Sequence, residues 1–242
     1  FQKLYGQEGI KMFLQVKNLT KSYRIGSFFS KEKKEILKNI SFDVKEGEIF
    51  SIVGQSGAGK STIGKILLGI EKEDSGEIVF LGRPLEKRKV QEIQMVFQDP
   101  YSSLNPVKKI YNAFEEPLKA HGFHKREERE EIMKKMMEMV NLQPDYIYRY
   151  PHEFSGGQRQ RICIARALCI NPSVVICDEP VSALDVSIQA QVLNLMKEIQ
   201  HKMNLSYVFI AHDLSVVEYM SDRIVVMYLG KVMEIATSDE LS

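Results

Sequence analysis

One short segment constrains the fold of this 242-residue chain more than any other, because it joins a buried strand to a helix through glycines. Glu48 to Val53 is a short apolar run bounded by Gly47 and Gly54, which predicts a buried strand. Lys60 to Ile70 carries aliphatic residues at helical spacing. The turn and the first helical residues are Gly54, Gln55, Ser56, Gly57, Ala58, Gly59, Lys60, Ser61 and Thr62. A strand that turns into a helix in this way is typical of α/β proteins.

The turn itself predicts a phosphate-binding site. It fits G-x-x-x-x-G-K-[ST] between a strand and a helix, which is the context that this motif requires. Glycines allow successive N–H groups to point at phosphate oxygens, and the helix adds the positive end of its dipole. Lys60 would place its charge on the β- and γ-phosphates, and the Ser61 hydroxyl is a Mg²⁺ ligand. A Gly-rich turn without a ligand is the alternative, and both flanking elements argue against it.

The N-terminal part predicts several closely spaced strands, at Phe13–Val16, Ile40–Val44, Gly76–Phe80 and Ile93–Phe97. Helical crossovers do not fit between all of them, so part of this region should be antiparallel. The polar stretch from Arg24 to Glu35 is interpreted as a solvated hairpin loop.

The middle and the C-terminal part differ from one another. From Pro106 to Tyr148 only helices are indicated, and the methionines near Met133 favour ordinary core packing over a partner surface. Strands and helices then alternate, at Gln158–Ile170, Val174–Cys177, Ser187–Met203, Tyr207–Ala211, Leu214–Met220 and Arg223–Met227. Such alternation predicts a mostly parallel sheet with helices on its faces. The predicted fold is an α/β P-loop NTPase core with an N-terminal antiparallel β subdomain and an inserted helical subdomain. The core comprises residues 12–100 and 165–242, and the helical subdomain residues 101–164.

Two carboxylates complete a nucleotide site. The apolar strand Val174–Cys177 ends in Asp178 and Glu179. Asp178 would reach Mg²⁺ through water, and Glu179 would act on the attacking water beside the γ-phosphate. An acidic pair at a strand end is often a solvated turn, so the prediction depends on the Gly-rich loop.

The segment Phe154-Ser155-Gly156-Gly157-Gln158 distinguishes among nucleotide-binding proteins. It opens the predicted helix Gln158–Ile170, so its N–H groups form a second anion-binding helix start. Here the sequence resembles the ABC ATPase family along nearly the whole chain. The resemblance implies that residues 155–158 of one subunit cap the ATP held at Lys60 of another, in a head-to-tail dimer.

The resemblance also implies roles for further residues. Tyr23 would stack on adenine, and Gln98 would contact both Mg²⁺ and a transmembrane subunit. Asp185, in Ser182-Ala-Leu-Asp185, would communicate across the dimer, and His212 would contact the γ-phosphate. With Glu179 and Lys60, Gln98 and His212 form the expected catalytic set, and Ser61, Gln98 and Asp178 form the expected metal site.

Three stretches resemble the oligopeptide/dipeptide importer branch, namely Phe97–Pro106, Cys177–Gln191 and Met227–Glu234. The expected activity is ATP hydrolysis that powers peptide transport. The expected partners are a second ATPase subunit, identical or different, permease subunits at the cytoplasmic face of the membrane and, indirectly, a solute-binding protein. The alternatives are an importer of nickel or another solute, a soluble ABC ATPase, and a poorly catalytic gating module, which Glu179 disfavours. Members of the branch usually carry a C-terminal extension beyond the point where this chain stops, so the chain is either truncated or a short member.

Composition adds exclusions. Lys and Arg number 33 against 32 Asp and Glu, so no general electrostatic attraction to nucleic acid is expected. No apolar run approaches the roughly 20 residues that span a bilayer. Phe1 to Lys11 does not read as a signal peptide, and a leader ahead of Met12 is one interpretation. The three cysteines lack metal-ligand spacing and are expected to be reduced thiols.

Overall fold

The computed structural model describes residues 12–25, 32–85 and 92–241, and within them two sheets carry the fold. The first is antiparallel, has the order β2-β1-β4-β5, and comprises β1 (Met12–Arg24), β2 (Lys33–Lys45), β4 (Ser75–Phe80) and β5 (Arg83–Pro84). The second has the order β10-β9-β3-β8-β7-β6 and comprises β3 (Ile49–Gly54), β6 (Ile93–Val96), β7 (Val174–Asp178), β8 (Ser206–Ala211), β9 (Arg223–Tyr228) and β10 (Lys231–Thr237). Its strands are parallel except for β10. The predicted fold class is confirmed.

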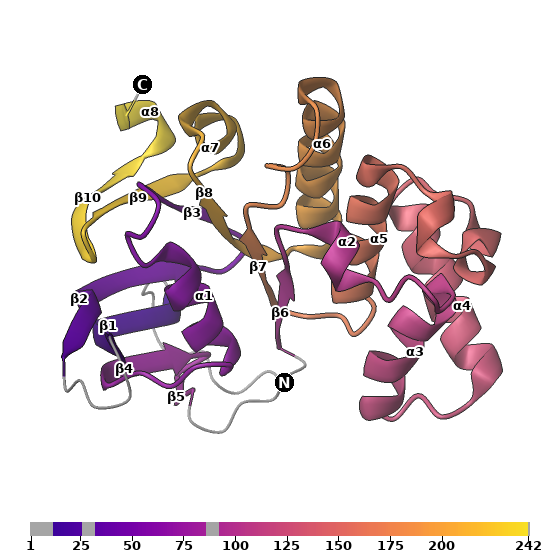
Figure 1. The fold of residues 1–242 in the computed structure, drawn as a ribbon, viewed down its shortest axis with the longest axis horizontal. Helices are drawn as coiled ribbons and strands as arrows, with labels where there is room; N and C mark the ends of the chain where they lie inside the picture. The colour runs from indigo at the N-terminus through magenta and orange to yellow at the C-terminus, as the bar shows by residue number, and fades with distance from the viewer. Residues whose placement is uncertain (1–11, 26–31, 86–91, 242) are drawn as a thin grey trace, which may run out of the picture.

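Helices cover the second sheet and form a lobe beside it. They are α1 (Lys60–Leu68), α2 (Pro100–Ser103), α3 (Ile110–Ala120), α4 (Arg126–Met139), α5 (Gly156–Leu168), α6 (Val186–Met203), α7 (Leu214–Met220) and α8 (Ser238–Leu241), with 3₁₀ turns η1 (Pro144–Tyr148) and η2 (Pro151–Glu153). Figure 1 shows α3 and α4 at one end of the molecule, the antiparallel sheet at the other and the parallel sheet between them. Helix α5 runs through residue 164 without a break, and the proposed boundary of the helical subdomain stays a prediction.

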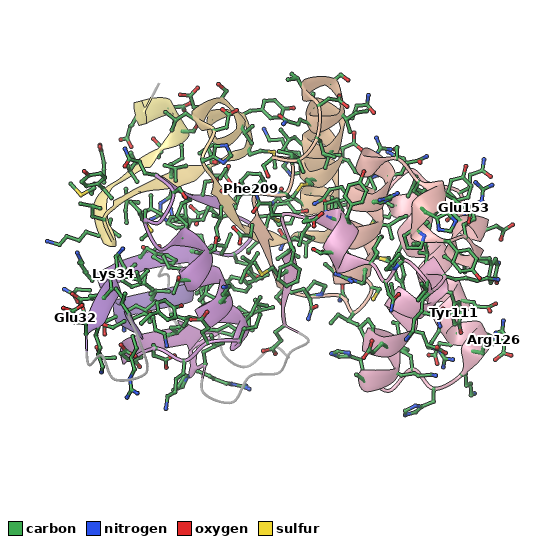
Figure 2. All side chains as sticks on the ribbon, in the orientation of Figure 1. Glu32, Lys34, Tyr111, Arg126, Glu153 and Phe209 are labelled. Atoms are coloured by element: carbon green, nitrogen blue, oxygen red, sulfur yellow. The ribbon has the colours of Figure 1, made fainter. Side chains whose placement is uncertain are left out.

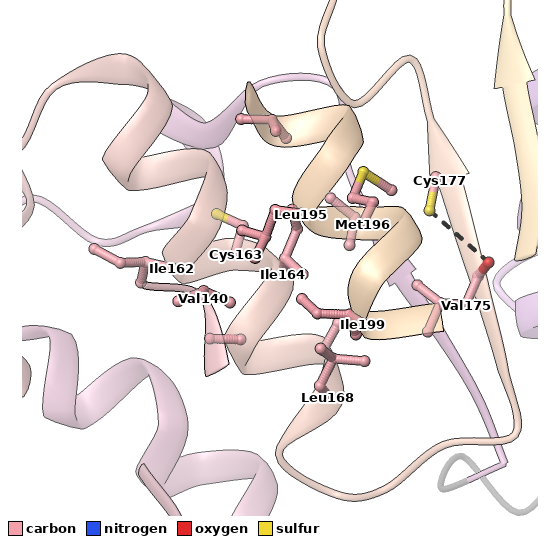
Figure 3. Packing of buried hydrophobic residues seen from close by; sticks show 14 of the residues in the cluster. Val140, Ile162, Cys163, Ile164, Leu168, Val175, Cys177, Leu195, Met196 and Ile199 are labelled. Carbon is pink, nitrogen blue, oxygen red and sulfur yellow. Dashed lines mark hydrogen bonds between the residues drawn. The ribbon is translucent and has the colours of Figure 1, made fainter. Parts of the chain in front are cut away.

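The parallel sheet separates two hydrophobic cores, because alternate residues of each strand point to opposite faces. On β7, Val175 and Cys177 join the core beneath α5 and α6, whereas Val174 and Ile176 join the core beneath α1 and the antiparallel sheet. Figure 3 shows the first core, where Met196 and Leu195 of α6 pack among residues from α5 and β7. These strands are mostly apolar because they are buried on both faces.

The N-terminal hairpin departs from the sequence prediction. Both β1 and β2 are 13 residues long, far longer than predicted, and Arg24 pairs with Lys33. The loop expected from Arg24 to Glu35 is therefore shorter, and residues 26–31 lie outside the described residues. Polar side chains on the solvated face of an antiparallel hairpin concealed its length. Figure 2 shows Glu32 and Lys34 at the outer edge of this hairpin, and it shows Phe209, which is fully buried, in the interior of the molecule.

Several boundaries and elements also differ from prediction. Helix α1 ends at Leu68 and not at Ile70, because Gly69 adopts a left-handed conformation with φ of 77° and caps the helix. Helix α5 begins two residues earlier than predicted. The short elements α2, β5, β10 and α8 were not predicted. The methionine prediction is confirmed, since Met133 and Met137 are fully buried.

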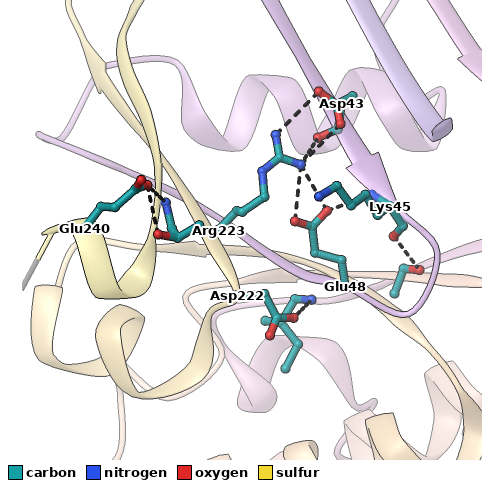
Figure 4. Close-up of polar contacts among 9 residues, drawn as sticks. Asp43, Lys45, Glu48, Asp222, Arg223 and Glu240 are labelled. Atoms are coloured by element: carbon teal, nitrogen blue, oxygen red, sulfur yellow. Dashed lines mark hydrogen bonds and ion pairs between the residues drawn. The ribbon is translucent and has the colours of Figure 1, made fainter. Parts of the chain in front are cut away.

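An ion-pair cluster ties the two sheets together (Figure 4). Arg223 at the start of β9 lies with its Nη1 3.2 Å from Asp43 Oδ2 of β2 and 3.2 Å from Glu48 Oε1, which precedes β3. The Glu48 carboxylate also accepts a hydrogen bond of 2.7 Å from the Lys45 N–H. Burial raises the pKa of Glu48, while its hydrogen bond from Lys45 and its contact with Arg223 oppose that rise.

The three cysteines are free and buried, as reduced thiols were expected to be. Burial raises the pKa of Cys163 to about 11 and that of Cys169 to about 12. A thiol with such a pKa is protonated at neutral pH and is a poor nucleophile. These cysteines therefore serve as small apolar core residues.

Candidate functional site

The Gly-rich loop connects β3 to α1 and is held against neighbouring strands. Gly54 ends β3 so close to β9 that a Cβ there would lie 2.2 Å from the Met227 carbonyl oxygen. Gly59 caps α1 with φ of 95°, and a Cβ at this position would lie 2.5 Å from Leu37 Cδ2. Both positions therefore require glycine, for closeness in the first case and for both conformation and closeness in the second.

Between these glycines the first three residues of the loop are exposed and the last is buried. Gln55, Ser56 and Gly57 are exposed, and Ala58 is buried and donates its N–H to the Gln55 carbonyl at 3.1 Å. The exposed part of the loop thus stands free for a ligand, and the buried part anchors it.

Lys60 folds back over the loop that precedes it. Lys60 is only 6% exposed, and its Nζ donates to the carbonyls of Gly54 at 2.7 Å and Gln55 at 3.1 Å. Burial lowers the pKa of Lys60, and the nearby carboxylates of Glu179 and Asp178 counteract this effect. A buried ammonium beside two carboxylates and a Gly-rich loop provides a positive charge for phosphate oxygens.

Ser61 and Asp178 bring two oxygen ligands together. The Ser61 hydroxyl, in the first turn of α1, donates to Asp178 Oδ1 at the end of β7, at 3.0 Å. Burial raises the pKa of Asp178, and Glu179 adds to the rise while the Ser61 hydrogen bond opposes it. Mg²⁺ prefers oxygen ligands and carboxylates above all, so this pair fits the magnesium site that the sequence predicts.

Glu179 is the centre of the polar cluster. Its Oε2 accepts a hydrogen bond of 3.1 Å from Gln98 Nε2 and lies 3.2 Å from His212 Nδ1. Gln98 Nε2 also donates to Ser182 Oγ at 3.3 Å. Three segments that are far apart in sequence thus meet at the carboxyl ends of β6, β7 and β8, where ligands bind in parallel sheets.

The backbone of Glu179 is also unusual. Its φ is +48°, a left-handed conformation that is uncommon for a residue with a side chain. The turn is held by the Glu179 N–H, which donates to the Ile210 carbonyl at 2.8 Å. Such conformations persist where the surroundings impose them, often at functional sites. This conformation directs the carboxylate toward Gln98 and His212. The sequence did not predict it.

Tyr23 lies at the end of β1, near the first turn of α1. Its hydroxyl donates to Glu71 Oε2, and burial and this carboxylate raise the pKa of Tyr23, while a hydrogen bond with the Thr62 side chain lowers it. Thr62 follows Ser61, so the tyrosine is placed next to the helix that carries the Gly-rich loop. Stacking of Tyr23 on adenine stays a prediction.

The predicted second anion site opens α5. Ser155 Oγ accepts from the Gln158 N–H at 3.3 Å, and Gln158 Oε1 accepts from the Ser155 N–H at 3.0 Å, which is a capping box. A Cβ on Gly157 would lie 2.4 Å from Ile188 Cγ2 of α6, so this glycine permits close packing. Within the part of the chain that the structure describes, residues 155–158 make no hydrogen bond or ion pair with Lys60.

Asp185 has a structural role within the chain. It caps α6 by accepting from the Ile188 N–H at 3.1 Å, and its Oδ1 also accepts from Ser187 Oγ at 2.8 Å. The Ile188 hydrogen bond is the main cause of its lowered pKa, and the Ser187 hydroxyl adds to it. Its expected contact across a dimer stays a prediction.

Tyr101 and Glu71 were missed by the sequence reasoning. Tyr101 lies on α2, which Asp99 caps through the Tyr101 N–H at 2.8 Å, and its ring lies 4.1 Å from Arg159 Cζ of α5. Asp followed by Pro is a helix-start signal, so α2 was predictable. The contacts of Tyr101 and Glu71 join segments far apart in sequence and carry no local signal.

The sequence profile of the family described as "ABC transporter" matches residues 37–182, which include the Gly-rich loop, Gln98, residues 155–158 and the carboxylates after β7. The chain belongs to the ABC transporter family.

Three similar members of this ABC transporter family are ATP-binding proteins of peptide transport. The chain is 48% identical to the oligopeptide transport ATP-binding protein AppF of Bacillus subtilis, over 94% of this chain and 73% of the relative. It is 47% identical to the oligopeptide transport ATP-binding protein OppF of Streptococcus mutans, over 97% and 78% respectively. It is 48% identical to the dipeptide transport ATP-binding protein DppF of Escherichia coli, over 94% and 71%.

Solved ABC structures share the fold. The chain aligns with a dimeric, post-hydrolysis state of the ATP-binding cassette MJ0796 bound to ADP and Pi, with a TM-score of 0.81 and 30% identity over 93% of this chain and 98% of that one. It also aligns with cbiO1 of Clostridium perfringens, part of the ABC transporter complex cbiONQ, with a TM-score of 0.82 and 27% identity over 95% and 90%. The described part of this ABC protein contains no helix that is long and apolar enough to cross a membrane.

Proposed function

We propose that this ABC protein is the ATP-hydrolysing subunit of a peptide importer. The observation that carries the proposal is the position of Glu179, whose Oε2 contacts Gln98 and His212 directly after the Asp178 that binds Ser61. A carboxylate held by two polar groups beside a phosphate-binding loop is suited to accept a proton from the attacking water. The names of the similar proteins support peptides as the cargo.

Each residue of the cluster has a distinct part in the proposed reaction. Lys60 and the loop N–H groups hold the phosphates, Glu179 receives the proton of water, and His212 and Gln98 fix the Glu179 carboxylate. Ser61, Asp178 and Gln98 would hold Mg²⁺, which when bound neutralises charge on the phosphates. Tyr23 would hold the adenine, through stacking.

The proposed active form is a dimer. The start of α5 at Ser155–Gly157 would bind the γ-phosphate held at Lys60 of a second subunit, because helix N-termini favour anions. The Ser155 and Gln158 side chains each accept from the backbone N–H of the other residue, so the N–H groups of Gly156 and Gly157 are what this loop would offer to an anion. The dimer would drive permease subunits from the cytoplasmic face of the membrane, with a solute-binding protein delivering the peptide.

The test is transport by the assembled complex. The chain is co-expressed with its permease subunits and reconstituted in vesicles together with the solute-binding protein, and Mg²⁺-dependent ATPase activity is measured with peptides or with nickel. We expect peptides to stimulate the activity and nickel to leave it unchanged. The reverse result would mean that the importer carries nickel and not peptides. The matched control is Lys60→Ala, which removes the phosphate ligand and should abolish activity.

Dimer formation is tested separately. The Glu179→Gln protein with Mg·ATP should sediment as a dimer if the chain pairs with itself, and Ser155→Arg should abolish that dimer while the monomer keeps its ATP affinity. Loss of monomer binding in Ser155→Arg would show that residue 155 acts on ATP within one chain.

A further inference from the structure

The segment that follows α1 clamps the end of β1, where Tyr23 lies. The Ser22 N–H donates to Asp74 Oδ2 at 2.8 Å, and Lys21 Nζ donates to the Lys72 carbonyl at 2.5 Å. Glu71 accepts the Tyr23 hydroxyl hydrogen bond. Three consecutive residues of β1 are therefore each bound by residues 71–74, which fixes the position of this strand end relative to α1.

Glu71 is itself anchored to α1. Its Oε1 lies 3.6 Å from Lys65 Nζ, while its Oε2 accepts from Tyr23, so one carboxylate bridges the helix and the tyrosine. The backbone adds to this anchor, because the Glu71 N–H donates to the Lys65 carbonyl at 3.3 Å. Glu71 is 21% exposed at its side chain, which limits competition from water. Lys65 belongs to α1, the helix that begins at Lys60 directly after the Gly-rich loop. Glu71 therefore fixes the position of the tyrosine hydroxyl relative to that loop.

We propose that Glu71 is a positioning residue that holds the Tyr23 ring in place for a nucleotide base. The inference rests on the proposed function, since it requires Tyr23 to stack on the base. A side chain that is already ordered loses less conformational freedom when a ligand binds, so a fixed ring binds its base more tightly. Glu71 acts through Tyr23 and makes no contact with the nucleotide itself. The part of the nucleotide affinity that comes from the base should therefore require Tyr23 and Glu71 together.

The experiment compares ADP with pyrophosphate, which lacks the base, by calorimetric titration in the presence of Mg²⁺. The variants are Tyr23→Phe, Glu71→Ala and the double variant. Each single change should weaken ADP binding about two- to tenfold, the scale of ordering one side chain. The double variant should be no weaker than the weaker single variant, because all three lack the same hydrogen bond. Pyrophosphate affinity should be unchanged throughout.

Two further variants separate the loss of the hydrogen bond from the loss of a carboxylate. Glu71→Gln keeps an oxygen that accepts from the Tyr23 hydroxyl and should retain most of the ADP affinity. Glu77→Ala removes an exposed carboxylate from the adjacent strand β4 and should leave both ligands unaffected. Additive losses in the double variant, or an equal loss of pyrophosphate affinity in Glu71→Ala, would overturn the positioning role.

The outcome also separates this inference from the proposed function. A wild-type chain that binds neither ADP nor ATP overturns both. Tyr23→Ala, which removes the whole ring, is titrated alongside these variants. Unchanged ADP affinity in Tyr23→Ala removes the tyrosine from the base site and Glu71 with it, while leaving the Glu179 cluster intact. Losses confined to Tyr23→Ala, with Glu71→Ala equal to wild type, reject Glu71 alone.

Discussion

The two predicted phosphate-binding regions of this protein are built in opposite ways. In the first, Ser61 and Asp178 come from separate segments, as do Gln98 and Glu179, and the side chains of each pair meet at the carboxyl end of the parallel sheet. In the second, the side chains of Ser155 and Gln158 pair with the backbone of their own loop. The first region is a collection of mutually dependent side chains, and the second is a preformed piece of backbone.

This difference indicates how each region should respond to mutation. Where side chains carry the chemistry, a change of one functional group should abolish the reaction and leave the fold intact. Where the backbone carries the binding, side chains matter because of their size. A larger residue in place of a glycine should therefore first lower the stability of the fold. The predictions below test this distinction from the largest expected effect to the smallest.

Glu179→Gln should lower ATP turnover by roughly 10²–10⁴-fold, the usual range for loss of a general base. The amide keeps the shape and accepts from Gln98, so ATP affinity should be unchanged. Single-turnover hydrolysis and equilibrium binding together measure the two effects. Turnover within a few-fold of wild type would remove Glu179 from the water-activating role.

Gly157→Ala should destabilise the protein by about 1–3 kcal/mol, the usual cost of overpacking. The added Cβ would lie 2.4 Å from Ile188 Cγ2, and an isoleucine is stiff close to its backbone. Gly156→Ala is the matched control, because its Cβ would lie 3.4 Å from Leu184 Cδ2, an ordinary contact. Urea unfolding measures both, and Ile188→Ala should relieve the strain of the first. Equal stability of the two alanine variants would contradict the packing argument.

The same distinction explains how far sequence reasoning reached. The parallel sheet was predictable because its strands are apolar on both faces, and the loop at Gly54–Ser61 because its residue types are needed at fixed spacing. The long β1–β2 hairpin was missed because its solvated face carries lysines and glutamates. The left-handed Glu179 and the contact between Glu71 and Tyr23 were not predictable, since each depends on segments brought together only by the fold.

Tyr101→Ala should cost about 0.5–1 kcal/mol of stability, the scale of an exposed cation–π contact. The ring joins α2, just after Gln98, to Arg159 of the helix that begins at Ser155, and so connects the two regions compared above. Tyr101→Phe keeps the ring and should be neutral. A double-mutant cycle with Arg159→Gln isolates the coupling, and a coupling energy near zero would mean that the two regions are joined by other contacts.

The smallest expected effect concerns the ion-pair cluster of Arg223, Asp43 and Glu48. This cluster holds the two sheets together and so supports the first phosphate-binding region. Burial raises the pKa of Glu48, so the folded protein binds this proton more tightly than the unfolded chain does. The stabilisation that follows is fully present below the ordinary glutamate pKa of 4.5 and is lost as pH rises through the folded-state pKa.

Glu48→Gln removes this dependence, because the amide stays neutral at every pH. The free energy of unfolding of the variant, relative to wild type, should therefore rise from pH 4.5 toward neutral pH, even though the variant loses charge-assisted hydrogen bonding to Arg223. The absolute difference at neutral pH should be small, since this loss opposes the gain. Glu46→Gln, at an exposed site two residues away, is the matched control for the loss of one carboxylate. A relative stability of Glu48→Gln that falls as the pH rises would mean that attraction to Arg223, and not burial, governs the Glu48 carboxylate.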